Sequence, residues 1–133
     1  LFYMAVDAYG GLVRYSVAGH NPPLLVGTDP GRVLRLTSDR GLPLGVAQNC
    51  AYEKVELHLQ PGDTLLLYTD GVVEAAAPNG SLYGETRLME LLCAHKNTPI
   101  QDLLDDLWRS LTAHMGSNEV VDDVTAVAIR FGG

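Results

Sequence analysis

Alternating hydrophobic and polar positions predict β-strands in the first half of the chain and again at its end. Residues 54–59 alternate strictly, which is typical of a half-buried strand. Residues 64–69 are apolar on both faces, so we expect this strand in the centre of a layered structure. A Tyr9-Gly10-Gly11 turn predicts a hairpin between the first two strands. The other predicted strands cover residues 1–7, 12–18, 24–27, 32–37 and 124–131.

Helical periodicity is found only late in the chain. Residues 99–115 carry apolar side chains at the i, i+3, i+4 and i+7 positions, which predicts an amphipathic helix, and residues 85–95 predict an earlier one. Thr98 is the predicted N-cap of the later helix, a proline takes the first helical position, and Gln101 closes a capping box. Gly116 ends this helix. The pattern as a whole predicts an α+β fold with a mostly antiparallel sheet system.

The composition fits one packed domain and excludes some partners. The chain has 133 residues, of which 47% are hydrophobic and 19% charged, so it can bury a core. Nine Lys and Arg residues against 16 Asp and Glu residues give a formal net charge of −7. This acidic balance argues against a nucleic-acid partner or an anionic membrane surface. No apolar run approaches the ~20 residues of a membrane span.

The cysteines indicate a reducing cellular compartment, and the first residues indicate that the sequence is part of a longer protein. Cys50 and Cys93 are too few for a disulfide framework and lie at no zinc-ligand spacing, so we interpret both as reduced, structural residues of a cytoplasmic protein. The given residues contain no signal-peptide pattern, so we expect none. The sequence starts at Leu1, without an initiator methionine and within a predicted strand. We therefore expect it to be a piece of a longer protein.

Acidic residues follow one buried strand and precede another. Asp70 comes directly after residues 64–69, and Asp122-Asp123 comes directly before the last strand. These carboxylates can converge if the two strands are neighbours, and oxygen-only ligands favour a hard cation such as Mg²⁺ or Mn²⁺. Gly71 would let the backbone turn sharply beside an ion. The alternative is a plain turn and a solvated loop, and on spacing alone this alternative is favoured.

Other polar and aromatic residues have plainer explanations. His20, beside Asn21-Pro22-Pro23, is either a proton shuttle or a donor that stabilises the loop, and the loop role is favoured because no acidic partner can be assigned. Trp108 is interpreted as a core or interface aromatic. The other histidines are expected on the surface or on helix faces: His58, His95 and His114. The acids early in the second helix are explained by its dipole: Asp102, Asp105 and Asp106.

Three sequence blocks, in this order, resemble a known family. The first pairs Ala-Gly-His-Asn-Pro-Pro-Leu-Leu at residues 18–25 with Gly-Leu-Pro-Leu-Gly at residues 41–45. The second is Leu-Gln-Pro-Gly-Asp-Thr-Leu-Leu-Leu-Tyr-Thr-Asp-Gly-Val-Val-Glu at residues 59–74, and the third is Asp-Asp-Val-Thr-Ala-Val-Ala at residues 122–128. From residue 1 to residue 131 the chain resembles the bacterial metal-dependent protein phosphatases of the sporulation-protein-IIE and sigma-regulator type. These are relatives of the type 2C serine/threonine phosphatases.

The resemblance implies a fold, a cofactor and a site. The implied fold is an antiparallel β-sandwich flanked by helices, and the implied cofactors are two Mn²⁺ or Mg²⁺ ions. Asp70 and Asp122 match the family's metal-ligand aspartates, while Gly71 and Asp123 match supporting positions, and no catalytic residue beyond the metal ligands is implied. The ions would activate a water and offset charge on the phosphoryl group, so that an acidic chain can handle an anionic substrate.

The chain departs from the family pattern at its N-terminal side. The family also has an Asp-x-x-Gly-His-Gly-like segment, whose aspartate bridges both ions, and this sequence begins after that segment. We therefore expect residues 1–133 to be the C-terminal portion of a type 2C-like catalytic domain, incomplete at its N-terminus. The isolated chain is predicted to be inactive or very weak as an enzyme.

Two functions follow from the resemblance and remain open. In the first, the parent protein is a serine/threonine phosphatase that acts on a phosphorylated, anti-anti-sigma-factor-like regulatory protein and so regulates transcription or stress signalling. In the second, the chain is a non-catalytic partner-binding module derived from the same fold. The sheet edges that an incomplete domain leaves uncovered predict self-association, with a homodimer as one form. The helix-rich segment 75–115 is a further candidate, as a partner-binding or regulatory flap.

Overall fold

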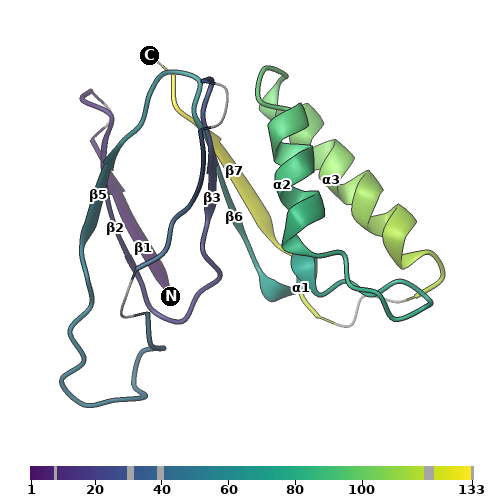
Figure 1. Cartoon of the computed structure of the whole chain (residues 1–133), viewed down its shortest axis with the longest axis horizontal. Helices are drawn as coiled ribbons and strands as arrows, with labels where there is room; N and C mark the ends of the chain where they lie inside the picture. The colour runs from purple at the N-terminus through teal and green to yellow at the C-terminus, as the bar shows by residue number, and fades with distance from the viewer. Residues whose placement is uncertain (8, 30–31, 39–40, 119–121, 133) are drawn as a thin grey trace.

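Two antiparallel β-sheets face each other, and helices cover one of them (Figure 1). The computed structural model describes residues 1–7, 9–29, 32–38, 41–118 and 122–132. The three-stranded sheet has the order β1-β2-β5, with β1 at Phe2–Val6, β2 at Leu12–Val17 and β5 at Val55–His58. The four-stranded sheet has the order β4-β3-β6-β7, with β4 at Val33–Arg35, β3 at Leu24–Val26, β6 at Thr64–Tyr68 and β7 at Ala126–Arg130. The predicted α+β sandwich is confirmed.

Strand β6 lies inside the four-stranded sheet and divides the core into two parts. Leu66 and Tyr68 face the helices, whereas Leu65 is buried against the three-stranded sheet and Leu67 packs beside it. Because successive side chains of a strand point to opposite faces, one apolar strand contributes to both clusters. This explains why residues 64–69 are apolar on both faces, as expected for a central strand. The strand lies between β3 and β7.

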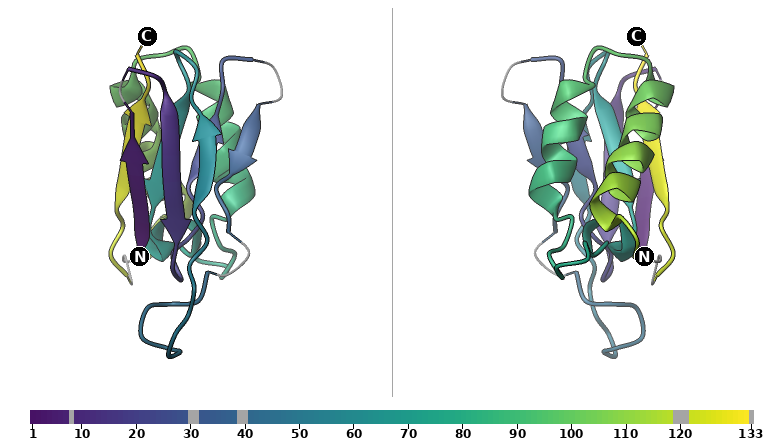
Figure 2. Two further views of the ribbon diagram at one scale, coloured as in Figure 1. Left: turned by 90° about the vertical axis from the view of Figure 1, so that its left-hand side faces the viewer. Right: turned by 90° about the vertical axis from the view of Figure 1, so that its right-hand side faces the viewer.

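Two helices cover the outer face of the four-stranded sheet. Helix α2 covers Glu85–Ala94 and α3 covers Ile100–Met115. Together they bury five leucines in the core cluster under the helices: Leu88, Leu92, Leu103, Leu107 and Leu111. Figure 2 shows α2 and α3 side by side over the strands, with α3 on the β7 side. The helix-rich segment therefore packs into the core along much of its length and does not stand free as a flap.

Polar contacts fix this helix layer to the sheet at two places. The Tyr68 hydroxyl donates to Glu85 Oε2 at 2.9 Å, and Arg35 Nε lies 2.8 Å from Glu85 Oε1. Burial, together with the Glu85 carboxylate, raises the pKa of Tyr68 above its ordinary range, so Tyr68 stays a donor. At the other end, Arg130 of β7 donates to Thr64 Oγ1 and to the backbone oxygens of His95 and Thr98. Both ends of the helix hairpin are thus tied to strands.

The structure corrects three local expectations. The N-cap of α3 is Pro99 and not Thr98, whose hydroxyl instead donates to His95 O at 3.1 Å and satisfies the end of α2. Trp108 is 54% exposed, which excludes the core alternative and leaves the interface alternative as a prediction. A short helix, α1 at Asp70–Val73, forms where only a turn was expected. Within the described ranges, no helix is both long enough and apolar enough to cross a membrane.

Candidate functional site

The register of β6 and β7 brings the predicted acidic residues to one end of the sandwich. The two strands pair antiparallel, with Tyr68 opposite Ala126. In an antiparallel pair, the end of one strand lies beside the start of the other. Asp70 follows the end of β6, and Asp122 and Asp123 precede the start of β7. In Figure 1 this is the end of the molecule where α1 is drawn.

Thr69 fastens the two acidic segments together. Its backbone N–H donates to Thr125 O at 3.0 Å, and its hydroxyl donates to Asp123 O at 2.8 Å. The same hydroxyl oxygen accepts the Thr125 N–H at 3.0 Å. Sequence reasoning gave Thr69 no role, although it lies in the block that carries the family resemblance. Its contacts depend on the pairing of β6 with β7, which the sequence does not display.

Gly71 shows how closely the two segments approach. A Cβ added to Gly71 would lie 2.5 Å from Asp123 O and 3.3 Å from Asp122 O. Contacts of 2.5 Å are far below van der Waals separation, so only glycine fits at this position without a shift of the backbone. Gly71 is buried, and it follows Asp70 in the first turn of α1. The backbones of residues 70–71 and 122–123 are therefore neighbours.

The donor set suits a hard cation but is incomplete. Asp70, Asp122 and Asp123 are all exposed, and Asp122 Oδ1 accepts the N–H of Asp123 at 2.7 Å. Mg²⁺ and Mn²⁺ prefer such oxygen ligands, and Mg²⁺ takes about six of them. Among the residues that the structure describes, no group of three or more His, Cys, Asp or Glu side chains could hold a metal ion. The carboxylates thus fit part of a coordination shell, and their metal role stays a prediction.

The first pair of sequence blocks also meets in space. Gly19 N–H donates to Gly41 O at 2.6 Å, and a Cβ on Gly19 would lie 2.5 Å from Pro43 Cγ. Gly19 has a φ of +63°, a backbone conformation that favours glycine. Next to it, the His20 ring nitrogen Nδ1 donates to Asn21 O at 2.7 Å. This hydrogen bond fits the loop-stabilising role of His20.

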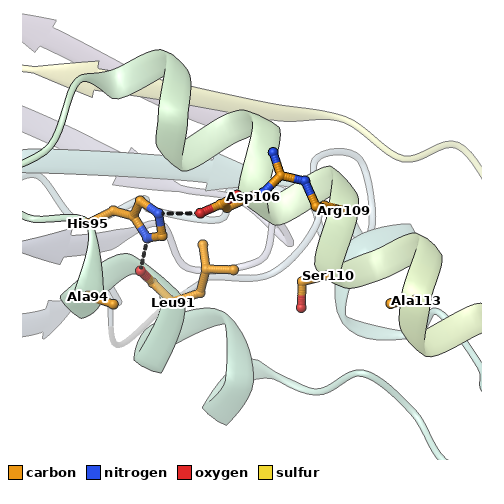
Figure 3. Close-up of a pocket in the computed structure, with 7 residues that line it drawn as sticks. All are labelled: Leu91, Ala94, His95, Asp106, Arg109, Ser110 and Ala113. Atoms are coloured by element: carbon orange, nitrogen blue, oxygen red, sulfur yellow. Dashed lines mark hydrogen bonds and ion pairs between the residues drawn. The ribbon is translucent and has the colours of Figure 1, made fainter.

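A second polar cluster lies between the two long helices, and sequence reasoning missed it. A cavity of about 510 Å³ is open to solvent there, and Figure 3 shows His95, at the end of α2, directed toward Asp106 of α3. His95 Nδ1 lies 2.9 Å from Leu91 O, and Nε2 lies 2.8 Å from Asp106 Oδ2. Leu91 O and the Asp106 carboxylate both accept hydrogen bonds, so the doubly protonated ring would satisfy both contacts. Arg109 also binds Asp106.

The surroundings of His95 favour its charged form. The hydrogen bond to the Leu91 carbonyl raises the pKa of His95, burial opposes this, and the Asp106 carboxylate raises it further. An imidazolium at the C-terminus of α2 also lies favourably in the helix dipole. The cluster joins the end of α2 to the middle of α3, where the sequence had suggested only a dipole role for Asp106. The sequence did contain one indication of this contact: the connection between the two helices is short, which makes them antiparallel neighbours.

Comparisons with known proteins agree on one family. The model of a family described as Stage II sporulation protein E (SpoIIE) matches residues 1–132. The phosphoserine phosphatase RsbU of Bacillus subtilis is 29% identical over 130 residues, which cover 98% of this chain and 38% of RsbU. The chain spans 20% to 38% of the length of three curated relatives that it matches.

Solved structures show the same fold. The SiaA-PP2C domain of Pseudomonas aeruginosa superposes with a TM-score of 0.82 at 23% identity, over 98% of this chain and 50% of that domain. The phosphatase domain of the cell fate determinant SpoIIE from Bacillus subtilis, presoaked with Mn, has a TM-score of 0.73 at 19% identity, over 99% of this chain and 56% of that one. The chain therefore has the fold of part of a PP2C-type phosphatase domain.

Gly71→Ala tests how closely the two acidic segments pack. The new Cβ must displace the backbone of residues 122–123, so we expect the free energy of unfolding to fall by about 1–3 kcal/mol. Urea unfolding of both proteins measures this change. Gly132→Ala is the matched control, because a Cβ there meets nothing within 4 Å. Equal stability of Gly71→Ala and the parent chain would contradict the close approach.

The His95 cluster predicts a pH-dependent contribution to stability. A histidine whose folded pKa lies above its unfolded value of about 6.5 stabilises the fold fully below that value, and the stabilisation is lost as the pH rises through the folded pKa. The unfolding free energy of the wild type should therefore exceed that of His95→Gln by more at about pH 5.5 than at about pH 8.5. Asp106, Asp102 and Arg109 are the charged groups beside the ring. A similar difference at both pH values, or the same trend in the exposed control His58→Gln, would refute it.

Proposed function

Because the chain belongs to the Stage II sporulation protein E (SpoIIE) family, we propose that it is part of a metal-dependent protein phosphatase. The proposed reaction is the hydrolysis of phosphoserine or phosphothreonine on a regulatory protein. The name of the relative RsbU, a phosphoserine phosphatase aligned over 98% of this chain, supports this reaction class. We also propose that residues 1–133 form the C-terminal portion of the catalytic domain, because the chain covers 50% and 56% of two solved domains of this fold.

The contact between residues 69–71 and 122–125 carries this proposal. It places the two predicted ligand-bearing segments side by side, although they are far apart in the sequence. In the proposal the carboxylates of Asp70 and Asp122 hold the ion, while Asp123 and Gly71 shape the site. A related domain was studied after presoaking with Mn, which supports Mn²⁺ as the ion, with Mg²⁺ as the alternative.

In the proposed reaction, the ion activates the water and the phosphoryl group, and the chain positions the ligands of the ion. A bound divalent ion polarises a phosphoryl oxygen and activates a water for attack. The chain orients the carboxylates through the Thr69 hydrogen bonds, and the exposed site leaves room for a protein substrate. With a net charge of −7, the chain alone would repel a phosphorylated partner, so cations at the acidic end also make approach favourable. The second ion that we propose requires ligands from outside this segment.

We propose a phosphorylated regulatory protein of the anti-anti-sigma-factor type as the substrate. The family resemblance of the three sequence blocks supports this class of partner. Such a partner acts with the transcription machinery, so the proposed site of action is the cytoplasm.

A non-catalytic module remains the second candidate. The described part of the chain offers no group of three metal-binding side chains, and this observation favours it. The two candidates differ in what the acidic end does. A phosphatase needs Asp70 to hold an ion, whereas a binding module does not.

Metal binding can be tested on this chain directly. Titration with Mn²⁺ should broaden the amide NMR signals of Gly71 and Asp123 before those of other residues. Asp70→Asn and Asp122→Asn should each weaken Mn²⁺ binding by about tenfold or more. Asp102→Asn, which removes an exposed carboxylate from α3, should leave the titration unchanged. Broadening that persists unaltered in Asp70→Asn would remove these residues from the site.

Turnover is tested on a longer protein that contains this segment and the rest of the catalytic domain. Phosphate release from a phosphoserine protein should require Mn²⁺ or Mg²⁺ and should fall by about a hundredfold in Asp70→Asn. The 133-residue chain alone should release no phosphate above background. Full activity of Asp70→Asn would exclude the phosphatase assignment and leave the binding module. Robust turnover by the isolated chain would show that the described ligands suffice.

A further inference from the structure

The connection between β4 and β5 is a long loop that the proposed ion site does not use. It runs from residue 36 to residue 54, and its described part forms no helix or strand. Loops longer than about 12–15 residues without secondary structure are uncommon in compact domains and often have a function. Residues 41–52 of this connection carry no charged side chain, and we call them the neutral loop. They include residues 41–45, the second half of the first sequence block.

The neutral loop lies at the same end of the sandwich as the acidic residues. Figures 1 and 2 show it beyond that end, further out than α1, in views that differ by 90°. Both ends of the loop are tied to β2 and the segment after it. Gly19 donates its N–H to Gly41 O at 2.6 Å, and the Ser16 hydroxyl donates to Glu53 O at 2.8 Å. A partner that approaches the acidic end therefore meets a loop with a fixed base.

The neutral loop exposes large apolar side chains. Leu42, Leu44 and Val46 are 49%, 57% and 66% exposed, and none of them belongs to either core cluster. Exposed apolar residues are ordinary where they are scattered over a surface, but these three lie within five positions of the chain. A grouped apolar surface of this kind is typical of a site that a partner covers.

Turns of the backbone present these side chains. Val46 donates its N–H to Pro43 O at 3.4 Å, and Gly45 between them has a φ of +84°, a conformation that favours glycine. Asn49 has a φ of +58°, which asparagine adopts more readily than most other residues. A Cβ on Gly45 would meet no described atom within 4 Å. Local turns, and not packing against the core, therefore shape the surface that carries Leu44 and Val46.

The absence of charge in the neutral loop decides which partner fits it. With a net charge of −7, the chain as a whole repels a phosphorylated protein, and the carboxylates of the acidic end add to this repulsion. Apolar contact does not depend on charge, so the neutral loop can hold such a protein beside the acidic end. A nucleic acid or an anionic membrane would need a basic patch, which residues 41–52 do not provide.

We propose that the neutral loop docks the phosphoprotein substrate through apolar residues that surround its phosphorylated side chain. This inference rests on the proposed phosphatase function and adds a determinant of its specificity. Leu42, Leu44 and Val46 would cover apolar side chains of the substrate, while the ion at the acidic end meets the phosphoryl group. A small phosphate ester would reach the ion without this contact. The loop thus contributes to the binding of a protein substrate and not to the chemical step.

The test compares two substrates of the longer protein that contains this segment and the rest of the catalytic domain. One is a serine-phosphorylated protein of the anti-anti-sigma-factor type, the other is p-nitrophenyl phosphate, and both are assayed with Mn²⁺. The double substitution Leu44→Ser and Val46→Ser removes apolar contact without adding charge. It should lower kcat/KM for the phosphoprotein about tenfold more than kcat/KM for p-nitrophenyl phosphate, through a higher KM. Leu34→Ser, on the exposed edge strand β4, is the matched control and should change both values by less than about twofold.

Further variants and a second measurement keep the test decisive. Far-UV circular dichroism shows whether each variant folds. If the double variant does not fold, the single variants Leu44→Ser and Val46→Ser decide, and each should show a loss of about threefold for the phosphoprotein relative to the small ester. An equal loss for both substrates in folded variants, or no loss for either, would overturn the proposal. So would a second copy as the occupant, seen in sedimentation as a dimer that the double variant abolishes.

The two substrates also separate this inference from the proposed function. If the wild-type longer protein hydrolyses p-nitrophenyl phosphate but not the phosphoprotein, the docking proposal fails and the phosphatase chemistry stands. If it hydrolyses neither substrate with Mn²⁺ or Mg²⁺, the phosphatase proposal fails and the docking proposal fails with it.

Discussion

The hydrogen bonds of Thr69 to residues 123 and 125 are the constraint on which the candidate site depends. They continue the β6–β7 ladder one step past its last strand pair, at the point where the chain leaves the sheet for α1. Without them, the residues after β6 and those before β7 would be two independent loops, and the entropy of each would oppose a fixed arrangement of carboxylates. Gly71 adds the second condition, since its missing side chain permits the backbones to touch. Thr69 and Gly71 thus hold the backbone segments that carry Asp70, Asp122 and Asp123 next to each other.

The four-stranded sheet supports this end because it is packed on both faces. Its strands send alternate residues into the cluster under the helices and into the cluster between the sheets. Polar ties hold the helices at both ends, through the Tyr68–Glu85–Arg35 contacts near α1 and through Arg130 at the far turn. The geometry of a set of metal ligands is held most precisely when the elements that carry the ligands are rigid. Asp70 and the backbone of Asp123 are therefore held next to a rigid sheet through the contacts of Thr69 and Gly71.

Most of the fold could be predicted from the sequence, because residues 54–59 alternate strictly, residues 64–69 form a short apolar run and the helices follow a 3.6-residue period. What the sequence did not reveal depends on pairs of elements. Thr98 has the composition of an N-cap, but the short turn makes its hydroxyl serve the end of α2 instead. Asp106 looked like a dipole residue until the helix hairpin placed it opposite His95. Asp70 and Asp122 could be singled out from their places beside buried strands, whereas the role of Thr69 needed the register of β6 and β7.

The proposed ion site lies at one end of β7, an edge strand of the four-stranded sheet. Strand β7 begins next to Asp122–Asp123 and presents its free edge along the rest of its length. A strand that paired with β7 near its start would bring its own residues close to those carboxylates. In the proposed metal site, the described carboxylates would fill only part of the shell that a hard cation needs, so further oxygen ligands would have to come from elsewhere. A polypeptide segment that covered the start of β7 would therefore be close enough to add oxygen ligands to the proposed site.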